Sequence, residues 1–245
     1  VSGSRRNANL VYYAGIAASY TGSDDEKTIQ YLSEAQQMGI KESLLFNRLS
    51  EHYKAKEQYD KAIEVVQKGR ELYPEDQGLL IVETNIYLKI GEPEKAIELL
   101  NMAIKADPTN AKFHYAVGTN YDGLTEDTTI TEEQRKLYFN KAIESYKSAI
   151  KIDSTYKDAI FNLGVLYYNE GANWFKLATN LPLNDPKYDE YIANGNESFK
   201  KSLPFMEKYH KLDPKDKSAM RTLAIIYQKL KMVTELRAIR ALMAD

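Results

Sequence analysis

The chain has 245 residues, 43% of them hydrophobic and 28% charged, which is typical of a folded domain rather than a disordered chain. Its formal net charge is −2, with lysine and arginine scattered among acidic residues, and this argues against a nucleic-acid-binding surface and a polybasic membrane-binding stripe. Cysteine is absent, which excludes disulfides, thiolate metal sites and a cysteine nucleophile.

Residues 1–9 are polar overall and are expected to be a linker or residues left from cloning. The chain begins at Val1 without a methionine or a recognisable signal peptide, so we expect it to be a trimmed piece of a longer protein. No apolar run approaches the roughly 20 residues that cross a bilayer, so membrane insertion is not expected. The compartment stays open between the cytoplasm and a bacterial envelope, and the Tyr-, Asn- and Lys-rich composition is compatible with both.

The strongest pattern in the sequence is an internal repeat with a period of 34 residues. The sequence Lys61-Ala62-Ile63-Glu64 returns at residues 95–98 and again at 141–144, at spacings of 34 and 46 residues. The two longer spacings in the chain, 46 and 60 residues, equal this period plus insertions of 12 and 26 residues. Tyrosines keep the same register, and they are Tyr20, Tyr53, Tyr87, Tyr121, Tyr167 and Tyr227.

Each repeat predicts a pair of helices. In residues 43–76, Phe46, Leu49 and Tyr53 recur at the spacing of one helix face, and a second face is centred on Ala62. A proline near the end of the repeat should stop the second helix, because proline lacks an amide hydrogen and clashes with the preceding turn. A single pair cannot bury its apolar face alone, so the pairs must stack on one another.

Residues 43–76 and 77–110 resemble consecutive tetratricopeptide repeats, whose pattern is a large residue, Leu-Gly, Tyr, Ala, a large residue, Ala and Pro. Three positions depart from the pattern, since Ser50 and Thr84 replace glycine and Glu83 replaces leucine, and we expect looser packing there. The first repeat follows the pattern at Phe46, Leu49-Ser50, Tyr53, Ala62, Val66, Gly69 and Pro74, and the second at Leu80, Glu83-Thr84, Tyr87, Ala96, Leu100, Ala103 and Pro108.

The resemblance implies an all-α fold, a right-handed α-α superhelix or solenoid of about six helix pairs. These pairs form one domain over residues 10–245, and the end pairs are less regular, as expected of repeats with only one neighbour. The expected units are 10–42, 43–76, 77–110, 111–156 with the 12-residue insertion, 157–216 with the 26-residue insertion, and 217–245.

The 12-residue insertion predicts a longer connection between two helices. We expect Gly123 to end the first helix, residues 125–129 to form a loop, and Thr131 with Gln134 to open the second helix as a capping box. A turn without direct function is favoured over a loop presented for contact, because added loop length costs little entropy.

The 26-residue insertion predicts a projecting helical hairpin, with each helix longer by about three turns. Its first helix should run past Gly171 through Trp174 and Phe175, and its second should begin near Tyr188 and bend at Pro204. Trp174 and Phe175 either form the hairpin's own small core, which is the favoured interpretation, or contact a partner.

No constellation of residues predicts catalysis. The histidines, His52, His114 and His210, lack partners at metal-ligand spacing and are expected on helix surfaces or in satisfied interfaces. A phosphate-binding glycine loop, a Gly-x-Ser-x-Gly motif and a His-Glu-x-x-His motif are all missing from the sequence. We therefore expect no metal, no cofactor and no enzymatic activity.

In proteins of this family the first helices of the pairs line a concave groove that holds a peptide or helix of a partner. Members that bind chaperone C-termini carry a cationic clamp, whereas Glu51 stands at a clamp position here and would repel a carboxylate. Apolar anchors near Tyr115, Phe161 and Tyr168 and backbone-bonding asparagines are expected instead, unless another part of the chain covers the groove. The implied groove residues are Asn47, Ile81, Asn85, Leu88, Tyr115, Thr119, Phe161, Asn162, Val165, Tyr168, Arg221 and Ile225, and a second contact is implied at Trp174 and Phe175 on the hairpin.

The expected function is a protein-binding scaffold or adaptor without catalysis, whose partner is a protein or peptide and not a nucleic acid. Two alternatives stay open. One is a recruiting or regulatory domain of a larger enzyme whose catalytic part lies elsewhere. The other is a self-assembling structural component, in which end helices such as the one predicted at 233–243 form a homodimer.

Overall fold

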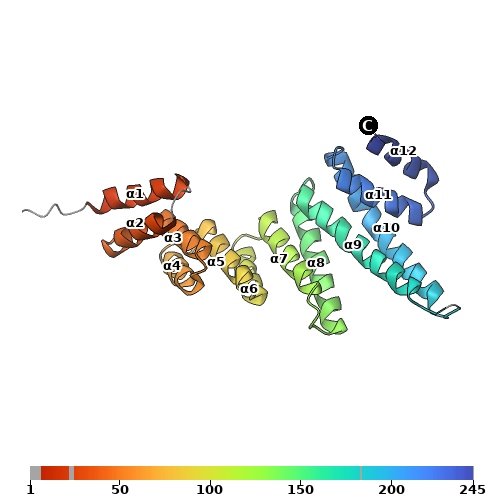
Figure 1. Ribbon diagram of the computed structural model, residues 1–245, viewed down its shortest axis with the longest axis horizontal. Coiled ribbons are helices and arrows are strands. Elements are labelled where there is room, and N and C mark those ends of the chain that lie inside the picture. Colours follow the sequence, from red (N-terminus) through yellow and green to blue (C-terminus); the bar gives the residue numbers. More distant parts are fainter. Residues whose placement is uncertain (1–6, 22–24, 183, 245) are drawn as a thin grey trace, which may run out of the picture. The chain divides into compact units, whose positions relative to one another are not determined.

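The computed structural model describes residues 7–21, 25–182 and 184–244. Every regular element in those residues is an α-helix (Figure 1). The helices fall into two compact units, Val1–Met102 and Ala103–Asp245. Residues 1–6 of the predicted linker lie outside the described part, and the first helix begins at Ala8.

The first unit is a row of helix pairs joined by short turns. Each helix from α1 to α4 packs against the next one in the chain, and α1 also contacts α3, as α3 contacts α5. Among the described residues α2 and α4 do not contact each other, so the second helices splay apart and the first helices form an inner row. The helices are α1 (Ala8–Thr21), α2 (Asp25–Gln37), α3 (Ser43–Ala55), α4 (Tyr59–Leu72), α5 (Gln77–Lys89) and α6 (Pro93–Ala106), whose end passes the division between the units.

The second unit has the same arrangement with longer helices. Each helix packs against the next one, α7 contacts α9, and α9 contacts α11. The packing between α9 and α10 is the most extensive, because these helices have 23 and 25 residues. The helices are α7 (Ala111–Thr125), α8 (Glu132–Ile152), α9 (Lys157–Thr179), α10 (Tyr188–Leu212), α11 (Lys217–Lys229) and α12 (Val233–Ala244).

The turn between the two helices of a pair has the same backbone in three places. Glu57, Gly91 and Lys231 have positive φ values of 57°, 79° and 60°. In each turn the next amide donates to the carbonyl of the repeat tyrosine of that pair, at 2.8 or 2.9 Å. This is the Schellman arrangement, in which a left-handed residue closes a helix and redirects the chain. The repeat tyrosine therefore marks a joint of fixed geometry.

The recurring Lys-Ala-Ile-Glu sequence has a structural cause. The ammonium groups of Lys61, Lys95 and Lys141 each lie over the ring of the tyrosine of their own pair, 5.0–5.6 Å from its centroid. The alanine that follows each lysine is 0% exposed. The motif thus combines a cation–π contact between the lysine and the repeat tyrosine with a small residue where two helices lie close together.

The three departures from the family pattern are tightly packed, so the expectation of looser packing is wrong. Ser50, Glu83 and Thr84 are 0%, 2% and 4% exposed. The Ser50 hydroxyl donates to a carbonyl one turn earlier, and the Glu83 carboxylate accepts hydrogen bonds from Arg70 and Gln67. Two of the three polar side chains are therefore satisfied, whereas the buried Thr84 hydroxyl has no partner among the described residues.

The 12-residue insertion connects α7 and α8. Helix α7 ends at Thr125 and not at Gly123, because the Arg135 guanidinium donates to the carbonyls of Thr125 and Asp127 and holds the end of the helix and the loop together. The capping box of Thr131 and Gln134 is confirmed, with both of its hydrogen bonds present.

The 26-residue insertion lengthens α9 and α10 into a hairpin. Helix α9 runs through Gly171 to its end at Thr179, and α10 begins at Tyr188. The two helices lie close together at Gly171 and Gly195, where a methyl group on either glycine would lie 3.0–3.2 Å from the carbonyl oxygen of the other. Helix α10 continues through Pro204 to Leu212, and a bend at this proline stays a prediction.

Candidate functional site

All twelve residues predicted for the groove lie on the first helices of their pairs. In the first unit they lie on α3 and α5, and in the second unit on α7, α9 and α11. Asn47 on α3 is half-buried, and its amide nitrogen lies beside Gly78 at the start of α5. The neighbouring Glu51 carboxylate is paired with the Lys54 ammonium at 2.8 Å.

Helix α5 presents the most open part of the predicted groove. Ile81, Asn85 and Leu88 lie on one face of this helix and are exposed, whereas the rest of α5 is largely buried. The Asn85 amide forms no hydrogen bond within the described residues and stands in the wall of a cleft of about 360 Å³. The other walls come from the end of α3 and the start of α4, and the lining is Lys54, Ala55, Glu57, Tyr59, Asn85 and Lys89.

In the second unit the predicted anchor Tyr115 belongs to a polar and aromatic network. Its hydroxyl accepts a hydrogen bond from the Asn162 amide at 3.2 Å, and its ring lies 5.1 Å from that of Tyr156. Nearby, the Tyr146 hydroxyl donates to the Asp122 carboxylate at 3.1 Å. Burial raises the pKa of the Asp122 carboxyl above its ordinary value, and the hydrogen bond from Tyr146 partly offsets this.

The rings of the other two predicted anchors pack against the long helix α10. The ring of Phe161 lies 4.7 Å from that of Tyr209, and the ring of Tyr168 is stacked on Phe199 at 5.3 Å. Burial raises the pKa of the Tyr168 hydroxyl. Burial, followed by a hydrogen bond to a carboxylate at the start of α11, raises the pKa of Tyr209 to about 12. The Phe161 and Tyr168 rings are half-buried, and a ring of α10 covers one side of each.

The remaining predicted residues divide between exposed and engaged positions. Arg221 and Ile225 are exposed on α11, whereas the Thr119 hydroxyl donates to a carbonyl of its own helix and Val165 is half-buried.

On the hairpin, the ring of Trp174 lies 5.2 Å from Tyr191 and that of Phe175 lies 5.2 Å from Phe199. The Lys229 ammonium also contacts Phe175, 4.2 Å from the centroid of its ring. Both hairpin aromatics thus take part in the hairpin's own packing.

The histidines make separate local contacts. His52 Nδ1 lies 2.6 Å from an Asp25 carboxylate oxygen, a pairing that sequence spacing did not indicate, and His114 Nε2 lies 3.1 Å from a backbone carbonyl. Nδ1 of His210 is buried without a partner among the described residues. The described ranges contain no group of three or more His, Cys, Asp or Glu side chains that could hold a metal ion. None of the described helices is both long enough and apolar enough to span a membrane.

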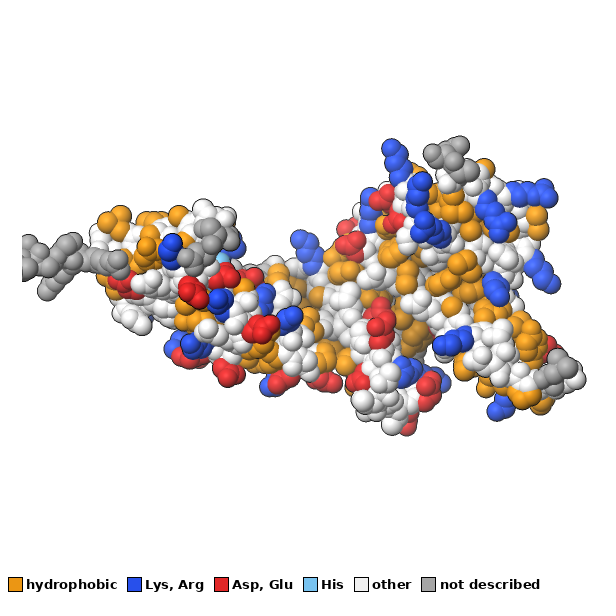
Figure 2. Space-filling view, viewed as in Figure 1, with side chains coloured by type: hydrophobic (Ala, Val, Ile, Leu, Met, Phe, Trp, Pro, Cys, Tyr) orange, Lys and Arg blue, Asp and Glu red, His pale blue; other side chains and the backbone are white. Residues whose placement is uncertain are grey.

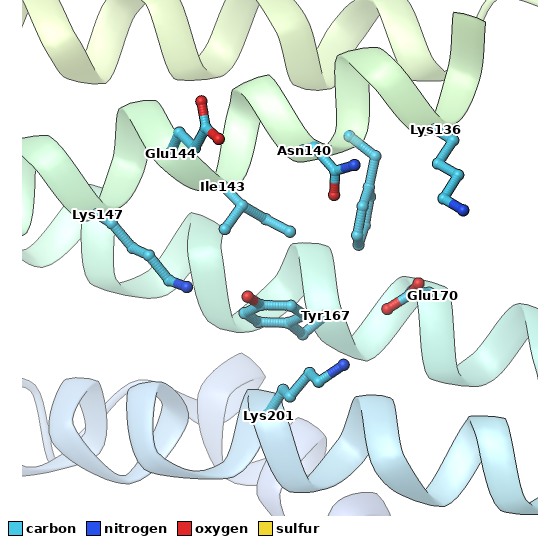
Figure 3. Close-up of a pocket in the computed structure, with 9 residues that line it drawn as sticks. Lys136, Asn140, Ile143, Glu144, Lys147, Tyr167, Glu170 and Lys201 are labelled. Atoms are coloured by element: carbon cyan, nitrogen blue, oxygen red, sulfur yellow. The ribbon is translucent and has the colours of Figure 1, made fainter. Parts of the chain in front are cut away.

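Sequence analysis missed a second cleft, of about 430 Å³, in the second unit (Figure 3). Residues of α8 at helical spacing form one wall, Tyr167 and Glu170 of α9 form the floor, and Lys201 of α10 closes the other side. Figure 3 shows Lys147 and Lys201 extending toward Tyr167 from their two helices. Two carboxylates line the cleft with three ammonium groups, so it does not select a ligand of one charge. The lining is Lys136, Phe139, Asn140, Ile143, Glu144, Lys147, Tyr167, Glu170 and Lys201.

Two family models match the sequence. One, described as a tetratricopeptide repeat, matches residues 53–118, and the other, described as a TPR repeat, matches residues 139–171. The matched segments contain the three Lys-Ala-Ile-Glu sequences and three of the recurring tyrosines from which the repeat was identified, Tyr53, Tyr87 and Tyr167.

Solved structures show the same fold. A fragment of MamA from Desulfovibrio magneticus RS-1 has a TM-score of 0.57 and 18% identity, and the match covers 87% of this chain and 99% of that one. YrrB, described as a TPR protein with an unusual peptide-binding site, has a TM-score of 0.57 and 15% identity, over 88% and 91% of the two chains. Identities this low support the fold alone.

Curated relatives are longer proteins. The BBSome complex member BBS4 homolog of Drosophila melanogaster is 27% identical over 198 residues, 67% of this chain and 40% of that protein. The TPR repeat-containing protein MJ1428 of Methanocaldococcus jannaschii is 25% identical over 195 residues, 73% of this chain and 32% of that protein. The chain therefore spans less than half the length of these relatives.

Proposed function

We propose that this chain, which belongs to the tetratricopeptide repeat family, is a protein-binding scaffold that holds a segment of its partner on the first helices of its pairs. Proteins of this family generally mediate protein–protein interactions. The proposal adds where the partner binds and how it is held. It assigns no catalytic step to the chain.

The exposed row on α5 is the observation that carries this proposal. Ile81, Asn85 and Leu88 follow one another at i, i+4 and i+7, so they form one stripe along the inner row of helices. Two apolar side chains flank an amide that can both donate to and accept from a peptide backbone. A partner segment would place apolar side chains against Ile81 and Leu88, and its backbone would bond Asn85 at the edge of the cleft.

The second unit contributes less open apolar surface to such an interaction. Tyr115, Phe161 and Tyr168 pack against their own chain, so they would offer a partner only their free edges. Ile225 on α11, 40% exposed, is a more accessible contact. We therefore place the main anchors on α5 and a secondary contact on α11.

The test compares variants that differ only in which surface they change. The parent and three variants are immobilised and incubated with lysate of the source cells: Ile81→Asp with Leu88→Asp, Asn85→Ala, and Leu72→Asp as a control. Leu72 and Ile81 are each 46% exposed, but Leu72 lies on α4, away from the inner row. A partner retained by the parent and by Leu72→Asp, but lost from the double α5 variant, supports the proposal.

Circular dichroism must first show that all variants fold. Equal retention by the parent and the folded α5 variant would contradict binding on α5. In that case the same comparison with Ile225→Asp would ask whether the partner is held by the second unit.

A further inference from the structure

Helix α1 has two opposite apolar faces and no charged residue. One face, which includes Val11, Tyr12 and Gly15, is buried against the rest of the first unit. A methyl group on Gly15 would lie 2.6 Å from the Leu32 side chain, so the packing of α1 on α2 is close. The opposite face is an exposed stripe, called here the outer stripe, formed by Leu10, Tyr13, Ala14, Ala17 and Tyr20.

The outer stripe is exposed to an unusual degree. Leu10, Tyr13 and Tyr20 are 69%, 65% and 67% exposed, the highest fractions for any large hydrophobic residue in the described part of the chain. Hydrophobic side chains are visible over α1 in Figure 2. A helix that is apolar all round is normally buried on all sides, and a contiguous apolar patch normally marks an interaction site.

We propose that the outer stripe binds the outer stripe of a second copy of this chain, with the two α1 helices antiparallel. This inference is independent of the groove on α5, because it rests on a different helix and on the face of that helix that points away from the rest of the first unit.

The spacing of the stripe is self-complementary. In an antiparallel pair centred near residue 15, Leu10 of one copy faces Tyr20 of the other, and Tyr13 faces Ala17. Each Tyr13 ring therefore meets a small residue, and Ala14 lies close to the two-fold axis, where a small residue lets the helices approach. The Arg48 guanidinium already covers one side of the Tyr20 ring at 4.8 Å and holds it at the end of the stripe.

The charge distribution of α1 is compatible with pairing to a second copy. With no charged side chain on α1, two such helices do not repel one another, and nothing on the helix selects a partner of opposite charge. The other end helix, α12, is a weaker candidate for covering the stripe. Its exposed positions include Glu235, Arg237 and Arg240, which would lose water against an uncharged helix.

The available area suits a weak dimer. Two tyrosines that are about two-thirds exposed offer roughly 200–330 Å² between them. With the leucine and the alanines of both copies, the pair would bury at most about 1,000 Å² in total, which is below the roughly 1,200 Å² of a stable specific interface and in the range of weak ones. Self-association should therefore depend visibly on protein concentration.

Sedimentation velocity tests the proposal. The parent should change from monomer to dimer as its concentration rises. A variant with Tyr13→Glu and Ala17→Glu should stay monomeric, and so should a variant with Tyr13→Lys and Ala17→Lys. When the two variants are mixed, opposite charges face one another across the pair, and a one-to-one dimer should form again.

Single cysteines test the geometry, because the chain has none of its own. Ala14→Cys should form a disulfide-linked dimer under mild oxidation. Leu10→Cys and Tyr20→Cys should each stay monomeric alone and cross-link when mixed. Leu242→Cys on α12, which is 54% exposed, is the control and should not cross-link.

Three results would overturn the proposal. A parent that is monomeric at its solubility limit would mean that the stripe is covered by something other than a second copy. Efficient cross-linking of Leu10→Cys with itself would show a parallel pair. A dimer lost in Leu242→Glu but kept in the Tyr13 and Ala17 variants would place the interface on α12.

Discussion

At the scale of single residues, the ion pair of Glu83 and Arg70 occupies a site where the family pattern has an apolar residue. The Glu83 side chain is 3% exposed and that of Arg70 is 19% exposed. Removing one member of a buried pair is costly because the other stays charged and loses its partner, whereas an apolar residue can replace the buried member with little loss. We expect Arg70→Met to lower the free energy of unfolding by about 3 kcal/mol.

Glu83→Leu, which restores the family residue, is the matched comparison. It should change the free energy of unfolding by less than about 1 kcal/mol, because the Arg70 head group can turn toward water. Urea unfolding followed by circular dichroism measures both. If Glu83→Leu proves as damaging as Arg70→Met, the pair itself stabilises the fold, and the comparison of buried ions with apolar replacements does not hold here.

The raised pKa of the Asp122 carboxyl predicts how the stability of the fold changes with pH. Burial raises its pKa in the folded chain above the value of about 4 that it has when unfolded. Between those two values the folded state binds the proton more tightly than the unfolded state, so the free energy of unfolding falls as pH rises through that interval. Asp122→Asn removes this contribution and keeps an oxygen that can accept from Tyr146. Its stability relative to the parent should therefore increase as pH is raised from about 4 toward neutrality.

Asp127 provides a control of opposite sign. Hydrogen bonds from the Thr129 amide and hydroxyl lower its pKa, so its contribution to stability is present above the unfolded pKa and is lost as pH falls. Asp127→Asn should lose stability relative to the parent as pH rises toward about 4, and Asp122→Asn should gain it as pH rises above about 4. Urea midpoints measured from below this pH to neutrality would contradict both expectations if the two differences had the same sign.

At the scale of elements, the hairpin of α9 and α10 depends on two glycines that face each other. A methyl group on Gly171 would lie 2.6 Å from the Phe199 ring, and one on Gly195 would lie 2.9 Å from the Phe175 ring. The variant Gly171→Ala with Gly195→Ala should separate the helices, cost about 1–3 kcal/mol per site, and shift the emission of Trp174 to longer wavelength.

A glycine with open space around it is the control for this prediction. A methyl group on Gly123 of α7 would have no described atom within 4 Å, so Gly123→Ala should stabilise the chain by about 0.5–1 kcal/mol through its helix propensity. Unchanged Trp174 emission in the double variant would mean that the hairpin relaxes around the two methyl groups.

Helix ends were predictable where the signal is local. The capping box at Thr131 and the start of α10 at Tyr188 depend on neighbouring residues, and both are found in the structure. The sequence predicts that α7 ends at Gly123, whereas the helix ends at Thr125. The Arg135 guanidinium, ten residues beyond Thr125, donates to the carbonyls of Thr125 and Asp127 and so satisfies the end of the longer helix. A contact of that kind cannot be inferred from glycine alone.

The inner-row positions were predictable from the repeat, but their surroundings were not. The register places Asn85 and Phe161 on first helices, as the structure has them. Whether such a side chain is open depends on helices distant in sequence. Asn85 stands in a cleft, whereas Phe161 is covered on one side by Tyr209, which comes from the long helix that the insertion produces.

At the scale of the whole molecule, the division into two compact units predicts two unfolding transitions. Trp174 is the only tryptophan and belongs to the second unit, while circular dichroism reports on both units. Arg70→Met, in the first unit, should lower the urea midpoint seen by circular dichroism and leave the midpoint of Trp174 fluorescence nearly unchanged. Equal shifts of both signals would show that the repeats unfold as one cooperative array.

The left-handed joints bear on how a chain of this kind can change in length. Glu57, Gly91 and Lys231 close the turns of pairs that keep the basic period, whereas the connection from α7 to α8, which carries the 12-residue insertion and is described throughout, has no residue with positive φ. An added residue would break the hydrogen bonds of such a turn, because its backbone geometry is fixed by hydrogen bonds to the helix before it. We therefore expect an added residue to be tolerated better between α7 and α8, where it breaks no such hydrogen bond, than in the turns at Glu57, Gly91 and Lys231.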